Sequence, residues 1–424
     1  MPALDDFPLV PPGIRPAAQV EFVPEKSRIK GHTGTATNWR TIGEFYNELA
    51  KSCYLSGKES SANPGTPALD ERCRNCFDSV VNNSRYVAIE IGVGGWQPHP
   101  AEKTQKRGYG DCKDLSTLLI SYLRRDAVTA YPCLVRTRSM GPLDPDFPSF
   151  NFNHVITMAV DGRDTMWLDP TCEVCPYNEL PSMEEGVLAL AVTPEGGQLV
   201  RTPPSRPEDN VTRRAVEIHI KENQKAYVAA TITVVGDNAQ GLRHFLATAT
   251  RDEVRINLER SLDGGAKRYK LLNWTVDNLN DRYRPLKITL MAERRSKCRR
   301  IGKTLYVRPY FFKPSLPFDR VDTDERPYPI DLFFPGTIQS TVTITWDTTL
   351  AVDSVGLPVP DSITTAFGAF HVSASSGPGK ITYTYEKRYT AYQVDTTEFA
   401  DYAVWQKRLK QAADNRAKLF LGTP

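Results

Sequence analysis

The chain has 424 residues, enough for two or three domains, with 40% hydrophobic and 24% charged residues, as is ordinary for a globular protein. Its net charge of +3 is too small to indicate nucleic-acid binding, and no basic block with interleaved aromatics occurs. No apolar run reaches the roughly 18 residues of a membrane span, and eight cysteines in a chain of this length do not make a disulfide scaffold.

The composition and the hydrophobic pattern change along the N-terminal half of the chain. Residues 1–36 are polar and rich in proline, which predicts an irregular arm or the remnant of an upstream domain. They contain no basic segment followed by an apolar core, so we do not expect a signal peptide. Over residues 37–200 helical patterns come first and strand patterns follow, which predicts an α+β domain.

The C-terminal half, residues 207–424, has a β pattern. Threonine, valine, isoleucine and tyrosine alternate with other residues between glycine, proline, asparagine and aspartate turns. This pattern predicts a large antiparallel β-sandwich, either one structure or two units at about 207–318 and 319–395. A polar helix over 399–421 is expected to close the chain.

The stretch "GYGDCKDLSTLLISYLRR", residues 108–125, places a cysteine where a helix begins. Asp111 is a good N-cap, Asp114 suits the first turn, and leucines at helical spacing supply a buried face. Cys112 therefore lies among unpaired backbone N–H groups at the positive end of the helix dipole, which favours a thiolate and can stabilise an oxyanion. The alternative is a small core residue that happens to start a helix.

A candidate base lies in the segment "NFNHVITMAVDGRDTMWLDPTC", residues 151–172, which reads as a β-hairpin with Asp161-Gly162 as its loop. That loop sets His154 directly opposite Asp169, with Cβ atoms about 5 Å apart on one face. A four-residue loop would leave the two diagonal, still within reach. Alternatively, His154 is a satisfied strand histidine and Asp169 a strand-end cap. A second histidine, His99, competes as the base, but the sequence offers it no obvious carboxylate partner.

The segments "GDCKDLSTLL", "YPCLVRTR", "FNHVI" and "WLDPT", in this order, resemble the transglutaminase-like superfamily. The likeness is closest to bacterial proteins that combine such a core, also described as a cysteine protease core, with β-rich domains of unknown function. "RYVAIEIGVGGWQPHPA", residues 85–101, is similar to that subgroup's approach to the cysteine. The specific resemblance covers about residues 70–200. It implies a papain-like core with Cys112 as nucleophile, His154 as base and Asp169 as orienter.

Active members of that superfamily carry out acyl transfer through a thioester, as cysteine peptidases, hydrolases or acyltransferases. The resemblance implies a peptide or protein substrate, an amine as a further acyl acceptor, and no cofactor. The small net charge argues against a nucleic-acid partner. The Cys112 N–H is expected to form part of an oxyanion hole, and Trp96 and Gln97 in "GGWQPHP" are the candidates for its second donor. Alternatively, these two residues form a turn in which the tryptophan simply packs.

Two CxxC pairs lie within this core, Cys73 with Cys76 and Cys172 with Cys175. Two such pairs can make a tetrahedral zinc site, but the separation between them is long for a compact ribbon. The first pair lies on the apolar stripe of a predicted helix. We therefore expect free thiols and no metal, with a zinc site or a disulfide as the alternatives.

A non-enzymatic function is the alternative to catalysis. The core would then be a catalytically degenerate scaffold, and the β-rich half an adhesion or binding module.

Relatives of this kind usually carry another β domain upstream and often an export signal, neither of which is visible here. We expect a periplasmic or secreted protein if an export signal is missing from this chain, and a cytoplasmic one otherwise.

Overall fold

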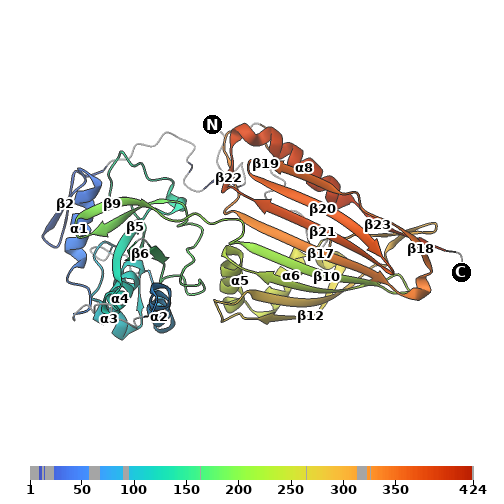
Figure 1. The fold of residues 1–424 in the computed structure, drawn as a ribbon, viewed down its shortest axis with the longest axis horizontal. Coiled ribbons are helices and arrows are strands. Elements are labelled where there is room, and N and C mark those ends of the chain that lie inside the picture. Colours follow the sequence, from blue (N-terminus) through green and yellow to red (C-terminus); the bar gives the residue numbers. More distant parts are fainter. Residues whose placement is uncertain are drawn as a thin grey trace. The chain divides into compact units, whose positions relative to one another are not determined.

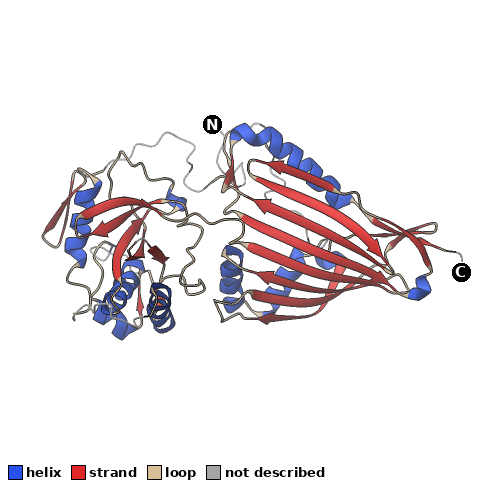
Figure 2. Ribbon diagram, viewed as in Figure 1, coloured by secondary structure: helices blue, strands red, loops and turns tan. Residues whose placement is uncertain are grey.

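The computed structural model describes residues 9–11, 14, 23–56, 67–88, 95–162, 164–263, 265–312, 322–324 and 326–422. The chain forms two compact units, which Figures 1 and 2 show as ribbons. The first comprises Pro12–Pro204, and the second comprises Met1–Pro11 with Ser205–Pro424. No helix in the described ranges is long and apolar enough to cross a membrane.

The first unit places helices beside a five-stranded antiparallel sheet of order β7-β6-β5-β8-β9. The helices are α1 (Trp39–Ala50), α2 (Leu69–Asn83), α3 (Ala101–Arg107) and α4 (Cys112–Arg125). The sheet strands are β5 (Thr129–Val135), β6 (His154–Asp161), β7 (Asp164–Leu168), β8 (Leu188–Thr193) and β9 (Gly196–Arg201). Smaller elements are β1 (Lys26–Ile29), β2 (His32–Thr35), β3 (Arg85–Tyr86), β4 (Tyr109–Gly110) and a 3₁₀ turn at Arg138–Met140.

Helix α4 is the element around which this unit packs. It contacts α2, α3, β5 and β6, and most of its residues are buried. The Ser116 hydroxyl donates a hydrogen bond of 3.0 Å to the backbone carbonyl of Val155, which ties the helix to β6. Helix α1 packs against β9, the last strand of this sheet, so closely that a Cβ at Gly43 would lie 2.1 Å from the Gly197 nitrogen. Only glycine fits there.

The predicted order of helices followed by strands matches this unit, and its mixture of helix and sheet agrees with the α+β class. Half of the irregular arm predicted for residues 1–36 lies outside the described residues. Within it, the prediction is wrong for β1 and β2, which form a hairpin. Lys30 and Gly31 take positive φ values of 46° and 85° in its turn, a conformation that closes tight hairpins.

The second unit is built on one eight-stranded sheet of order β12-β13-β11-β10-β17-β21-β20-β19. Its strands are β10 (Val211–Ile220), β11 (Ala226–Val234), β12 (Tyr269–Asp277), β13 (Leu286–Arg294), β17 (Gly336–Trp346), β19 (Asp361–Thr365), β20 (Gly368–Gly377) and β21 (Lys380–Tyr389). The smaller sheets comprise β14 (Arg299–Ile301), β15 (Thr304–Val307), β23 (Ala417–Leu421) and β18 (Val352–Gly356), and β16 (Ile330–Asp331) with β22 (Gln393–Val394). The helices are α5 (Asp237–Thr248), α6 (Arg251–Ser261), α7 (Gly265–Arg268) and α8 (Phe399–Asp414), with 3₁₀ turns at Thr348–Leu350 and Thr396–Glu398.

Burial alternates along the large sheet, as the sequence pattern predicts. In β21, Ile381, Tyr383 and Tyr385 are buried while the intervening residues are less so. The core on this face also contains side chains of α6, α8 and the four-stranded sheet. The second layer is therefore a mixture of helices and a small sheet, and the prediction of a pure sandwich is corrected in this respect.

Of the two alternatives left open for this half, the large sheet agrees with one structure, because it draws strands from both 207–318 and 319–395. Three further predictions for this half differ from the structure. Strands β10 and β17 are parallel, because the long connection between them lets the chain re-enter the sheet in the same direction. Helices α5 to α7 interrupt the β pattern, with α6 opened by a capping box between Thr250 and Glu253. The closing helix ends at Asp414, and "AKLFL" continues as strand β23 because its side chains alternate between buried and exposed.

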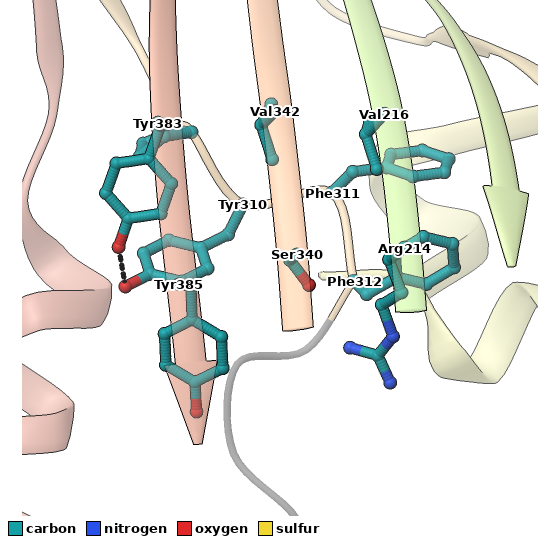
Figure 3. A pocket seen from close by; sticks show the side chains of 10 residues that line it. Arg214, Val216, Tyr310, Phe311, Phe312, Ser340, Val342, Tyr383 and Tyr385 are labelled. Carbon is teal, nitrogen blue, oxygen red and sulfur yellow. Dashed lines mark hydrogen bonds between the residues drawn. The ribbon is translucent and has the colours of Figure 1, made fainter. Parts of the chain in front are cut away.

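Aromatic residues fill part of the inner face of the large sheet. Figure 3 shows Tyr310, Phe311 and Phe312 lying across β10, β17 and β21. The Tyr383 hydroxyl donates a hydrogen bond to the Tyr310 hydroxyl. The Arg214 guanidinium lies 4.9 Å from the centre of the Phe312 ring, and burial lowers the pKa of Arg214 to about 10. A cation on an aromatic face recovers part of the lost hydration energy.

Trp405 on α8 anchors the helix to this core, and its replacement tests the packing. The side chain is fully buried, with ring centres 5.4 Å from Phe367 and 5.3 Å from Phe370. We predict that Trp405→Ala lowers the free energy of unfolding by about 3–5 kcal/mol, the usual cost of removing a buried large aromatic side chain. Urea unfolding followed by circular dichroism measures this. Val404→Ala is the matched control, because Val404 is 49% exposed on the same helix, and its change should stay within about 0.5 kcal/mol.

Candidate active site

Cys112 is the first residue of α4, as predicted. The Asp111 side chain caps the helix by accepting a hydrogen bond from the Asp114 N–H at 3.2 Å. Cys112 is 4% exposed and packs in a cluster with Tyr46 and Leu134. As the first helical residue it has a backbone N–H without an intrahelical partner, so the thiol and this N–H group lie at the positive end of one helix.

His99 has a carboxylate partner, contrary to the expectation from the sequence. Asp114 Oδ1 accepts a hydrogen bond of 2.7 Å from the His99 backbone N–H, and Asp114 Oδ2 lies 3.1 Å from His99 Nδ1. Asp114 therefore binds the loop before α3 to the first turn of α4. Trp96, in the same loop, lines one pocket with Cys112.

The His154 hairpin forms with a register that differs from the main prediction. Asp161 pairs with Asp164 and Thr157 with Leu168, so the turn lies one residue later than predicted. Gly162 supplies the positive φ of 61° for this turn, while Asp161 stays in the strand and accepts a hydrogen bond from Arg72. His154 and Asp169 are consequently diagonal neighbours, as in the alternative register, and the distance from His154 Nε2 to Asp169 Oδ1 is 3.5 Å.

A second carboxylate faces the same imidazole nitrogen. Glu184 Oε1 lies 3.3 Å from His154 Nε2, and the side chains of His154, Asp169 and Glu184 are 13%, 1% and 6% exposed. Glu184 belongs to the connection between β7 and β8, where its backbone carbonyl accepts a hydrogen bond from the Thr202 hydroxyl at 2.5 Å. Sequence reasoning missed Glu184, because this irregular segment has no periodicity or motif that marks it.

The electrostatics of this group follow from its burial. Desolvation opposes charge on His154, but Glu184 and Asp169 outweigh it and hold the pKa of His154 well above its usual value. Burial and the neighbouring Asp169 raise the pKa of Glu184 to about 7. The pKa of Asp169 is lowered despite its burial, because His154 is close and the Thr171 N–H and hydroxyl donate to Asp169 Oδ1 at 2.9 and 2.8 Å. Asp169 therefore carries a lasting charge, while Glu184 gains or loses its proton near neutral pH.

Cys112 and His154 line one small pocket of about 50 Å³. Cys112 is among the groups that raise the pKa of His154, after Glu184 and Asp169, so the two side chains are close. Since His154 Nε2 faces the carboxylates, Nδ1 is the ring nitrogen left for the thiol. Trp96 forms part of the pocket wall and packs edge-on against Phe150, with ring centres 5.5 Å apart. The pocket therefore brings the side chains of Cys112, His154 and Trp96 together.

The structure does not bring Gln97 to this pocket. Its side-chain NH₂ donates a hydrogen bond of 3.2 Å to the backbone carbonyl of Leu49, near the C-terminal end of α1. Carbonyls in the last turn of a helix lack intrahelical partners, and Gln97 satisfies one of them. Of the two oxyanion candidates, only Trp96 is among the pocket-lining residues.

The cysteine pairs differ from each other. Cys172 and Cys175 form a disulfide, with Cα atoms 5.4 Å apart, so the prediction of free thiols is wrong for this pair. The chain turns back there, since the Cys172 N–H donates to the Asp169 carbonyl and the Cys175 N–H to that of Cys172. Cys73 and Cys76 are free and buried on α2. Within the described residues the four cysteines do not form a zinc cluster.

His154, Asp169 and Glu184 are the one described group of three whose ligand atoms come within 4.8 Å of one another, as a metal ion requires. An ion there would take His154 Nε2 and the two carboxylates. A proton on Glu184 satisfies the charge balance equally well, because the group is then neutral with imidazolium and one carboxylate. The predicted absence of a metal stays a prediction.

Comparisons with known proteins found matches of low sequence identity. No protein-family model matches it, and no curated protein is similar to it in sequence. One solved structure, described as a "putative protease" from Parabacteroides distasonis, is 11% identical with a TM-score of 0.47. That similarity covers 89% of this chain and 55% of the other, so this chain spans about half of that protein. Baculovirus P35 is 7% identical with a TM-score of 0.13, covering 50% of this chain and 97% of P35.

The raised pKa of Glu184 predicts a pH dependence of stability. Below pH 4.5 the group is protonated in both the folded and the unfolded chain, and between 4.5 and about 7 only the unfolded chain releases the proton. Stability should therefore fall as the pH rises through this window, by up to about 3 kcal/mol. Glu184→Gln should remove this loss. Thermal unfolding at pH 5 and pH 8 measures it, and Glu173→Gln, at an exposed position nearby, should keep the parental difference. Equal pH profiles for parent and Glu184→Gln would refute the assignment.

Proposed function

We propose that this protein catalyses cysteine-dependent acyl transfer at peptide or protein amide bonds, as a protease or as a transglutaminase-like or transpeptidase-like enzyme. The observation that carries the proposal is the placement of Cys112 and His154 in one pocket, with Asp169 and Glu184 behind the imidazole. A thiol nucleophile, a base and a group that orients the base are the three parts this chemistry needs. The resemblance of the sequence to the transglutaminase-like superfamily supports the same residues.

In the proposed first step, His154 takes the proton of the Cys112 thiol, and the thiolate sulfur attacks the carbonyl carbon of an amide. The carbonyl oxygen becomes an oxyanion. As this intermediate collapses, the carbon–nitrogen bond breaks and the His154 imidazolium gives its proton to the leaving amine. The product left on the enzyme is a thioester on Cys112. Asp169 stabilises the imidazolium and keeps the ring oriented.

In the second step, water or an amine attacks the thioester carbonyl while His154 takes its proton. The carbon–sulfur bond breaks, and the proton returns to the Cys112 sulfur. Water gives hydrolysis, and an amine gives transfer. The oxyanion of both steps needs two donors, for which we propose the Cys112 backbone N–H and the Trp96 indole N–H. Gln97, whose NH₂ binds Leu49, is not assigned this role.

Alkylation of the thiols tests the first step without a substrate. Burial raises the pKa of the other free cysteines, to about 12 for Cys73 and Cys76, so they should react slowly. We predict that iodoacetamide labels Cys112 first at pH 6.5, and that His154→Ala slows this labelling at least tenfold. Peptide mapping by mass spectrometry measures the rates.

The control for this experiment is His219→Ala. His219 is also paired with a carboxylate, Asp347, at 2.9 Å, but it lies on β10 in the other unit. It should leave the labelling rate unchanged. Equally slow labelling of all free cysteines in the parent would instead support a catalytically degenerate scaffold.

Turnover tests the assigned roles once a peptide and amine library yields a substrate. Cys112→Ala should form no acyl adduct by intact mass, and His154→Ala should be nearly as impaired, because these two residues act as a unit. Asp169→Ala should be milder, since Glu184 still faces His154 Nε2. Trp96→Phe, which keeps the packing but loses the N–H, should lower kcat by about 100-fold. An adduct that persists on Cys112→Ala at the parental rate would contradict the nucleophile assignment.

A further inference from the structure

A larger cavity, of about 420 Å³, lies in the second unit and is lined mainly by arginines. It is built where the end of β13, the β14–β15 hairpin and the turn from α8 to β23 come together. The first two segments follow each other in the chain, whereas the turn from α8 to β23 is more than 100 residues further on. The lining residues are Arg294, Arg299, Ile301, Tyr306, Arg308, Asp414 and Arg416.

Strand register explains why the arginines share one face. In β15, Leu305 and Val307 are buried, so Tyr306 and the following Arg308 lie on the opposite, outer face. Strand β14 pairs with β15 so that Arg299 is opposite Tyr306. It therefore joins the same outer face.

The register with β23 adds a fourth basic group. Val307 pairs with Ala417, so continuing the antiparallel ladder by one position sets Arg308 opposite Arg416. Two like charges directly opposite each other on one face destabilise a sheet. Burial and the charge of Arg308 lower the pKa of Arg416, in agreement with this proximity.

The positive charge is only partly balanced within the protein. Asp263 accepts from both Arg268 and Arg308, the latter at 3.2 Å. By contrast, Arg294, Arg299 and Arg416 form no ion pair with any residue in the described part of the chain. An anion in the cavity would supply the negative charge and the oxygen acceptors that these guanidinium groups lack.

We propose that this cavity binds a compact anion with two or more phosphate groups. Planar guanidinium groups from several directions match phosphate oxygens with paired hydrogen bonds, and the Tyr306 hydroxyl adds a further donor. The volume is within the range of about 300–1,000 Å³ that small-molecule sites occupy. The Asp414 carboxylate also lines the cavity and offsets part of the charge of these three arginines, and the remaining positive charge is left for the ligand to balance. The ligand is a free oligophosphate or the phosphorylated headgroup of a lipid.

Isothermal titration of the full chain with tripolyphosphate at low ionic strength tests the proposal. We expect binding of one molecule per chain, weaker binding of inorganic phosphate, and an affinity that falls as salt is added. Arg299→Gln combined with Arg416→Gln should weaken tripolyphosphate binding at least about tenfold, the scale of a charge-assisted hydrogen bond. Arg213→Gln, at an exposed arginine of β10, is the matched control and should bind like the parent.

Two further measurements complete the test. Tripolyphosphate should raise the melting temperature of the parent but not of the double variant, which should itself fold, since it loses like-charge repulsion. Flotation with phosphatidylcholine vesicles containing phosphatidylinositol 4-phosphate distinguishes a lipid headgroup from a free oligophosphate. If the ligand is a lipid headgroup, the parent should float with the vesicles and the double variant should not. The proposal is overturned if the parent binds no tripolyphosphate, or if the double variant and Arg213→Gln bind equally. Cys112→Ala should bind like the parent, so this test is independent of catalysis.

Discussion

Charge balance in a buried space governs the candidate active site. His154, Asp169 and Glu184 are all largely withdrawn from water, and an imidazolium with two carboxylates would carry a net negative charge. Burying an unbalanced charge is expensive, so one proton is retained. Thr171 donates two hydrogen bonds to Asp169, whereas Glu184 Oε2 has no partner in the described structure. The retained proton therefore belongs on Glu184, and its pKa of about 7 reflects this division.

This division gives the two carboxylates different parts in the proposed chemistry. Asp169 supplies a constant charge that keeps the imidazole oriented, and Glu184 supplies one that depends on pH. When Glu184 ionises, it stabilises the imidazolium of His154 further. A base that becomes easier to protonate also becomes a weaker proton donor to the leaving amine. The protonation state of Glu184 therefore affects how readily the candidate catalytic histidine, His154, accepts a proton and gives it up.

Sequence patterns predicted the two elements of the site that depend on interactions between neighbouring residues. The helix start at Cys112 follows from the Asp111 cap and the leucine spacing, and the hairpin around His154 follows from alternation and a turn signal. The exact register did not follow, because it depends on which turn residue takes a positive φ, and both Asp161 and Gly162 are compatible with a tight turn. A shift of one residue in the turn changed the pair from direct to diagonal neighbours.

Contacts between distant segments could not be read from the sequence. The partnership of His99 with Asp114 and the approach of Glu184 to His154 each require the folded chain. The same holds for the parallel pairing of β10 with β17, since alternation specifies a strand but not the direction of its neighbour. The disulfide between Cys172 and Cys175 depends on a local turn that the CxxC spacing permits but does not impose.

The outer face of the four-stranded sheet shows how a core can impose an arrangement of surface charge. Leu305 and Val307 must face inward to fill the core, and this choice fixes the face of every other residue in β15. Arg308 is consequently held opposite Arg416 by packing on the other side of the sheet. The core requires neither residue to be basic, because both side chains lie on the outer face. The positive charge of this surface is therefore a property of the sequence that folding alone does not explain, and binding of an anion does.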